Sequence, residues 1–424
     1  MTEPHRTHGE AAQPAAMTSA RPRRAVTLAA AALVLGIGAA ALLVEVGVRL
    51  FCRVTDIPFF FWDPLLGPRR APQQSGRYVY GQGHIDARYR FNNQGWNHPS
   101  AYATRKQPGL TRVCMIGDSY VEALQVDVGR AMFSVAADAM SRPERPSEWL
   151  AFGCSGWGTS QEYEVIRHYA LEYSPDAVIL LFVQNDPYDC SPYLAPQEPF
   201  APVYLLDESD RLELLFAEPY TPSRFRRWSS MSAAVRYFVV QKDMIGRINR
   251  LRHGTHTVRG VGGAPRREQI AGLENRRVPG LDALSLPQRE QRTWLLVERL
   301  LEAARDECRR RGAVFAVAFR GFAARIEAPL TGETITVPPR EADPWCLHER
   351  ASEMGPEQVA PICDRLAIPY LDLTDALTEM VRTTRRSHVF PDDGHYSPAA
   401  HAAAGRALAA WVDSLLTTRV ADRR

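Results

Sequence analysis

The sequence lacks several short patterns that would point to common kinds of site. Its seven cysteines are scattered and contain no C-x-x-C pair, so neither a zinc knuckle nor a thioredoxin-type redox centre is indicated. No cluster of His, Asp and Glu has the spacing of metal ligands, and we expect neither a metal nor another cofactor. The G-x-S-x-G elbow is also missing, which argues against the α/β-hydrolase fold. We find no internal repeat and no heptad run.

The chain also lacks a strong charge of either sign. Its formal net charge is only +3 over 424 residues, and the basic residues occur in short runs such as Arg309–Arg311. Nucleic-acid binding needs a concentrated basic face, so we exclude that class of partner. The chain is 45% hydrophobic and 23% charged, which is typical of a globular protein with a substantial core.

An odd number of cysteines leaves at least one free thiol in an unmodified monomer. Cys114 lies in an apolar run and is expected to be a small core residue. In an oxidising compartment, Cys346 with Cys363 and Cys154 with Cys190 are candidate disulfide pairs.

One long apolar run stands near the N-terminus. Ala25–Val44 contains no charged residue, and at about 1.5 Å per residue this run spans the roughly 30 Å hydrocarbon core of a bilayer. We therefore predict a disordered cytoplasmic tail at 1–24 and a single transmembrane helix at 25–48. The arginines before the run place the N-terminus on the cytoplasmic side of the cytoplasmic (inner) membrane. The residues after the helix would then lie in the periplasm or outside the cell. The alternative is a cleavable signal, but the run is long and no A-x-A site lies beyond it.

The remainder divides into an arm and an α/β domain. Residues 49–110 are rich in Pro, Arg and aromatic residues and predict an extended arm. Over 111–417, short apolar runs alternate with helical patterns, which predicts a three-layer α/β/α sandwich with a central parallel sheet. An insertion at about 190–285 interrupts the alternation. The predicted elements are strands at 112–116, 148–152, 176–183, 313–319 and 369–373, helices at 160–173, 233–251, 288–311 and 398–416, and a hairpin at 203–215.

Polar residues follow several of these strands, where ligands of doubly wound sheets gather. Gly117-Asp118-Ser119 follows the first strand, and taken alone it also fits a helix N-cap. The loop Gly153–Gln161 follows the second strand and is rich in glycine. Asn185 follows the third strand and has an Asx turn as its alternative role. Asp392-Asp393-Gly394-His395 precedes the last helix, and its D-x-x-H spacing suits an imidazole with an orienting carboxylate.

Together these blocks resemble the SGNH (GDSL-type) hydrolase family, over about residues 75 to 417. The resemblance implies a flavodoxin-like sheet with Ser119 as nucleophile, His395 as general base and Asp392 as the residue that orients it; Asp393 could compete for that role. It further implies an oxyanion hole built from Ser119, Gly156 and Asn185, with Gly153 as an alternative to Gly156. One block departs from the family, since Val183-Gln184-Asn185-Asp186 stands where G-x-N-D is expected.

The resemblance implies a serine-dependent ester hydrolase that works through an acyl-Ser119 intermediate. Membrane-anchored members are associated with adding or removing acetyl groups on cell-surface polysaccharide. We therefore expect an acyl-ester substrate, with acetylated carbohydrate favoured. A polysaccharide O-acetyltransferase with the same triad and a catalytically silent carbohydrate-binding scaffold are the alternatives.

Overall fold

The computed structural model describes residues 21–80, 83–194, 201–215, 230–242, 244, 280–332, 356–391 and 393–422. The chain forms two compact units, residues 1–52 and 53–424. In the first unit, helix α1 (Arg21–Phe51) contains a stretch, Ala25–Phe51, that is long and apolar enough to cross a membrane. Membrane anchors and secretory signals both contain such a helix.

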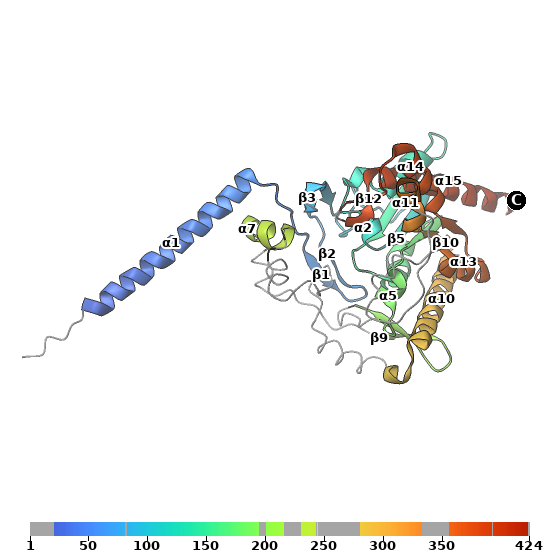
Figure 1. Ribbon diagram of the computed structural model, residues 1–424. Helices are drawn as coiled ribbons and strands as arrows, with labels where there is room; N and C mark the ends of the chain where they lie inside the picture. Colours follow the sequence, from blue (N-terminus) through green and yellow to red (C-terminus); the bar gives the residue numbers. More distant parts are fainter. Residues whose placement is uncertain are drawn as a thin grey trace, which may run out of the picture. The chain divides into compact units, whose positions relative to one another are not determined.

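A five-stranded parallel sheet forms the centre of the second unit (Figure 1). Its strands lie in the order β11-β10-β7-β5-β6, so the chain order reverses between β5 and β7, as in flavodoxin-like folds. All neighbouring pairs are parallel. The predicted α/β/α fold is therefore confirmed. The strands are β5 (Thr111–Gly117), β6 (Ser147–Gly153), β7 (Ala177–Phe182), β10 (Val314–Phe319) and β11 (Tyr370–Asp372).

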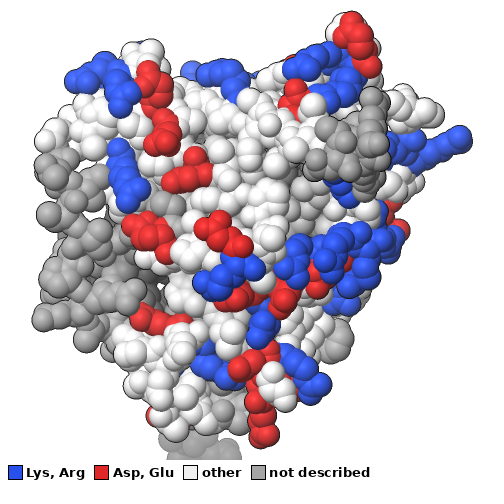
Figure 2. Space-filling model, turned by 90° about the vertical axis from the view of Figure 1, so that its right-hand side faces the viewer, with Lys and Arg blue, Asp and Glu red and all other residues white. Residues whose placement is uncertain are grey.

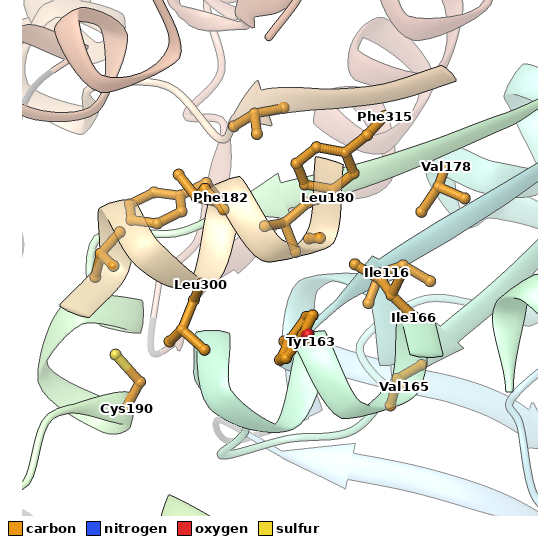
Figure 3. Packing of buried hydrophobic residues seen from close by; sticks show 14 of the residues in the cluster. Ile116, Tyr163, Val165, Ile166, Val178, Leu180, Phe182, Cys190, Leu300 and Phe315 are labelled. Atoms are coloured by element: carbon orange, nitrogen blue, oxygen red, sulfur yellow. The ribbon is translucent and has the colours of Figure 1, made fainter. Parts of the chain in front are cut away.

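The central residues of the strands are mostly apolar because both faces of the sheet are covered. In β5, Cys114 and Ile116 join one buried cluster, whereas Val113 and Met115 join the cluster on the opposite face. This alternation follows from the two-residue period of a strand. Figure 3 shows the first cluster, in which side chains of β5, β7 and β10 pack against α4 (Thr159–His168) and α10 (Leu286–Arg310).

Helices cover both faces of the sheet. The second buried cluster contains residues of α3, α14 and α15, and α3 packs directly on α15. The short helix α5 contacts both α4 and α10 on the other side. The remaining bounds are α2 (Ser119–Glu122), α3 (Met132–Met140), α5 (Asp186–Cys190), α11 (Ala323–Thr331), α13 (Pro356–Arg365), α14 (Thr374–Thr384) and α15 (Pro398–Asp422).

The segment predicted as an extended arm contains two antiparallel strand pairs. β1 (Phe60–Asp63) pairs with β2 (Gly67–Arg70), and β3 (Ser75–Tyr80) pairs with β4 (Ile85–Arg90). Trp96 of this segment is buried in the main core, where its ring packs edge-on against Phe152 at 5.0 Å. The arm is therefore part of the folded domain.

Part of the predicted insertion lies within the described residues. The hairpin predicted at 203–215 is present as β8 (Val203–Leu206) and β9 (Leu212–Leu215). The described part of the predicted helix at 233–251 contains α7 (Ala233–Val235) and the π-helical turn η4 (Arg236–Gln241).

The cysteine pairing suggested by the sequence is not formed. Cys154 and Cys190 are both buried free thiols, so the prediction of a bridge between them is wrong. Their side chains take part in core packing instead. Cys363 is also a buried free thiol, and its suggested partner Cys346 lies outside the described residues.

Basic and acidic side chains are interspersed on the molecular face drawn in Figure 2. Among the ion pairs of the described residues, several involve α10, including Arg310 with Glu307 and Glu298 with Arg365. Such exposed pairs contribute little to the free energy of folding.

Candidate active site

The candidate site forms at the carboxyl edge of the sheet, where the chain order reverses. Gly117 at the end of β5 lies opposite Gly153 at the end of β6, and Ile116 lies opposite Leu180 of β7. Ser119 follows β5 by two residues. It therefore stands beside the ends of three strands, at the position where doubly wound sheets bind ligands.

A tight turn presents Ser119 at the start of α2. The carboxylate of Asp118 caps this short helix by accepting the backbone N–H of Tyr120 at 2.9 Å. Gly117 is required for close packing, because a Cβ atom there would lie 2.6 Å from Cγ2 of Val121. Ser119 itself is half-buried.

The hydroxyl of Ser119 meets the imidazole of His395. The two atoms involved, Ser119 Oγ and His395 Nε2, are 2.6 Å apart although 276 residues separate them in sequence. His395 lies in β13 (Asp393–Tyr396), which pairs with β12 (Val389–Phe390) just before α15. A base at this distance can remove the serine proton as the hydroxyl attacks.

A carboxylate contacts Nδ1, the other ring nitrogen of His395. Asp393 Oδ1 contacts Nδ1 of His395 and also accepts the His395 backbone N–H at 2.8 Å. Burial by itself raises the pKa of Asp393, but the hydrogen bonds from His395 outweigh it and hold the pKa below its ordinary value. Asp392, the carboxylate that the sequence favoured, lies outside the described residues. Among the described residues, Asp393 is therefore the candidate for the orienting carboxylate.

Two residues that the sequence analysis did not identify support the histidine turn. The Tyr120 hydroxyl donates to the Gly394 carbonyl at 2.6 Å, and its ring centroid lies 4.9 Å from that of His395. The guanidinium of Arg320 lies 5.1 Å from the Tyr120 ring centroid, which permits a cation–π contact. Only the position of Tyr120, directly after the serine, could have suggested such a role.

The two candidate oxyanion glycines have different surroundings. Gly153 is packed against α2, since a Cβ atom there would lie 2.4 Å from the backbone nitrogen of Glu122. Gly156 is exposed, has a φ of +83° and would leave a Cβ atom free of contacts. It is the third residue of a turn in which Trp157 N–H donates to the Cys154 carbonyl at 3.2 Å. A positive φ at this position is one that glycine adopts without strain.

Asn185 lies at the start of α5, close to the turn that carries Ser119. Its amide nitrogen is 3.3 Å from Asp118 Oδ2 and donates to Asp189 Oδ2 at 2.6 Å. Gln184, which precedes Asn185, donates to the Gly321 carbonyl and accepts from Arg320. In this way Gln184 links the end of β7 to the residues that follow β10.

Four carboxyl groups gather behind the site. Burial raises the pKa of Asp118. Burial and the repulsion of neighbouring carboxylates raise the pKa values of Glu162 and Asp186 well above the ordinary value. Burial also raises the pKa of Asp189 to about 7. Among the described residues, no group of three or more His, Cys, Asp or Glu side chains has the arrangement of a metal site.

Solved structures with a similar fold include two acetyl xylan esterases. A mutant of Axe2 from Geobacillus stearothermophilus shares 12% identity, covers 71% of this chain and 94% of its own, and has a TM-score of 0.35. AlAXEase shares 10% identity, covers 72% of this chain and 98% of its own, and has a TM-score of 0.33. A protein from Desulfitobacterium hafniense, assigned to the lipolytic G-D-S-L family, shares 9% identity with this chain. It covers 71% of this chain and 99% of its own, and has a TM-score of 0.33. No family model and no curated protein matches the sequence.

Proposed function

We propose that the protein is a serine-dependent ester hydrolase that acts outside the cytoplasmic membrane on acyl esters, with acetylated carbohydrate as the favoured substrate. The observation that carries the proposal is the chain of contacts from Ser119 through His395 to Asp393. These residues come from two widely separated parts of the sequence, and their contacts support the proposed roles of nucleophile, base and orienting carboxylate.

In the proposed reaction, Ser119 Oγ attacks the ester carbonyl while Nε2 of His395 takes up its proton. Asp393 fixes the ring so that Nε2 faces the serine, and it stabilises the imidazolium that forms. The proton then passes from His395 to the departing alcohol, which leaves an acyl-Ser119 ester. Water attacks that ester with His395 again as base, and the carboxylic acid and the free serine are regenerated.

Three donors would stabilise the tetrahedral oxyanion: the backbone N–H groups of Ser119 and Gly156 and the side-chain amide of Asn185. Within the described part of the chain, the Gly156 N–H makes no backbone hydrogen bond. Asn185 would replace its longer contact with Asp118 by one to the oxyanion. Removing one such donor costs about 3 kcal/mol of barrier height in characterised oxyanion holes.

The favoured substrate and location rest on two further observations. An apolar helix suited to a membrane anchor precedes the catalytic unit, and the arginines before it favour an outward-facing domain. Structures named as acetyl xylan esterases are among those with a similar arrangement. Acetyl esters on cell-surface polysaccharide would be within reach of an enzyme tethered in this way.

The test is turnover of an aryl acetate by the full chain in detergent or nanodiscs, together with acetylated oligosaccharides. Ser119→Ala and His395→Ala should abolish acetate release, while Ser134→Ala on α3 is a matched serine control whose hydroxyl donates to the Val128 carbonyl. A fluorophosphonate probe should label Ser119 alone. Full activity of Ser119→Ala contradicts the proposal. Acetyl transfer to an added sugar would identify a transferase, and an unlabelled Ser119 without turnover would identify a silent scaffold.

A further inference from the structure

A buried arginine of the N-terminal arm is connected to the turn that carries Gly156. We propose that Arg70, the last residue of β2, acts through Glu122 as a positioning residue for the oxyanion hole. This inference rests on the proposed function, since it assigns a role within the same site. Two features of the structure support it: a buried charge pair, and the position of the carboxylate within that pair.

The first feature is the ion pair itself. Arg70 at the end of β2 donates twice to Glu122, from Nε to Oε1 at 2.5 Å and from Nη2 to Oε2 at 3.1 Å. The Arg70 side chain is 8% exposed and that of Glu122 is not exposed at all. Burial lowers the pKa of Arg70, but the Glu122 carboxylate more than offsets it, so the arginine remains charged.

The second feature is the place of Glu122 between the nucleophile and the glycine turn. It is the last residue of α2, the short helix that begins at Ser119. Its Oε2 also accepts the backbone N–H of Ser155 at 3.1 Å and the Ser155 hydroxyl. A single carboxylate therefore holds the nucleophile's helix and the residue just before Gly156 together.

The arm holds the other side of α2 as well. Asn97 donates from its side-chain amide to the Glu122 carbonyl at 2.7 Å. Gly95, which has a φ of +86°, lies so close to Arg70 that a Cβ atom would be 2.4 Å from the Arg70 carbonyl oxygen. The backbone around Arg70 is thus fixed by the same segment that holds the end of α2.

Loss of Arg70 would leave the Glu122 carboxylate buried without its cationic partner. Such a group takes up a proton or rearranges, and in either case its hydrogen bonds to Ser155 weaken. The Gly156 N–H would then shift away from the position of the oxyanion. Displacements of about 1 Å in a catalytic group can reduce turnover by about 100-fold.

The structure offers a matched control on the same hairpin. Arg69 has a side-chain exposure of 9%, close to that of Arg70, and pairs with Asp63 at 2.8 Å. Its guanidinium stacks 4.8 Å from the Trp96 ring centroid rather than reaching Glu122. Arg69→Met therefore removes a buried arginine pair from the same hairpin and leaves the link to Ser155 in place.

We would measure kcat, KM and the pH profile of aryl acetate hydrolysis for full-length Arg70→Met, Glu122→Gln and Arg69→Met in nanodiscs. Arg70→Met and Glu122→Gln should reduce kcat by about 10- to 100-fold, with KM nearly unchanged. The pH at which activity falls should stay the same, since His395 and Asp393 are untouched. An aryl boronic acid that forms a tetrahedral adduct with Ser119 should lose affinity in parallel. Arg69→Met should keep its kcat.

The possible outcomes separate the inference from the proposed function. If Ser119→Ala is inactive but Arg70→Met and Glu122→Gln retain the original kcat, the inference alone is overturned. A kcat that falls equally in Arg69→Met also overturns it, because the effect then reflects general loss of hairpin stability. If Arg70→Met does not fold, Glu122→Gln decides the matter, since it preserves side-chain shape. Absence of turnover and of Ser119 labelling in the unaltered chain overturns both proposals.

Discussion

The Tyr120 hydroxyl donates to the Gly394 carbonyl at 2.6 Å, which joins the residue after Ser119 to the residue before His395. The Tyr120 ring also packs at 4.9 Å from the rings of both His395 and Tyr396. The serine and histidine segments are thus connected independently of the contact between Ser119 and His395. This link therefore holds together the two segments that form the candidate site.

The first prediction concerns this link. Tyr120→Phe removes one buried hydrogen bond but retains the ring, so we expect a loss of roughly 1 kcal/mol in the free energy of unfolding. Because Gly394 becomes free to shift, kcat should also fall several-fold, with KM unchanged. Steady-state kinetics and thermal unfolding of the full chain measure the two effects. A control is Tyr102→Phe, whose hydroxyl donates to the Ala151 carbonyl away from His395; it should lower stability and leave kcat unaltered.

The second prediction separates the two neighbouring aspartates. Asp393→Asn should reduce kcat by as much as about 10⁴-fold, since an asparagine at this position favours the wrong histidine tautomer. Asp392→Asn serves as the matched control, and the contact between Asp393 and His395 predicts that it retains most activity. If instead Asp392→Asn is the inactive variant, the D-x-x-H spacing of the sequence identified the orienting residue and the proposed role of Asp393 is wrong.

Much of the fold could be predicted from the sequence, because strands buried on both faces leave a strong signal. The strands predicted at 112–116 and 176–183 correspond to β5 and β7 within one residue at each end. The β1–β2 hairpin of the arm was missed because β2 reads Gly-Pro-Arg-Arg. Its arginines are buried only because Asp63 and Glu122 pair with them. Such pairing depends on tertiary contacts that no local pattern contains.

The sequence also selected part of the candidate site. The order of the blocks singled out Ser119 and His395, and the structure brings these two side chains within hydrogen-bond distance. Their catalytic roles stay predictions. Choosing between Asp392 and Asp393 depends on the path of one short turn, which spacing does not determine. Tyr120, Arg70 and Glu122 carry no motif of their own, and their contacts become visible only after the chain has folded.

The third prediction distinguishes the two glycines by what each substitution would damage. Gly156→Ala places a side chain at a φ of +83°, which costs about 1–2 kcal/mol and turns the N–H away from the oxyanion. We expect kcat to fall at least 10-fold in a folded protein. Gly153→Ala would clash with the backbone of α2 and should lower the melting temperature much more. If Gly153→Ala folds normally and loses only kcat, Gly153 is the better candidate for the oxyanion hole.

The fourth prediction concerns the buried carboxyl groups behind the site. Glu162 is fully buried, and among the described residues neither of its carboxylate oxygens has a hydrogen-bond partner. Burial and the nearby Asp118 raise its pKa in the folded state. Between the unfolded pKa, about 4.3, and this higher value, the folded chain holds a proton that the unfolded chain has released. Glu162 therefore lowers stability progressively as the pH rises through that interval.

Glu162→Gln removes this titration and should stabilise the protein more at pH 8 than at pH 5. Melting temperatures of the full chain at the two pH values measure the difference directly. Glu379→Gln is the control, because that side chain is 61% exposed on α14 and should alter neither value appreciably. If Glu162→Gln instead lowers the melting temperature by the same amount at both pH values, relative to the unaltered chain, Glu162 is an ionised partner in a favourable pair. The raised pKa assigned to Glu162 would then be wrong.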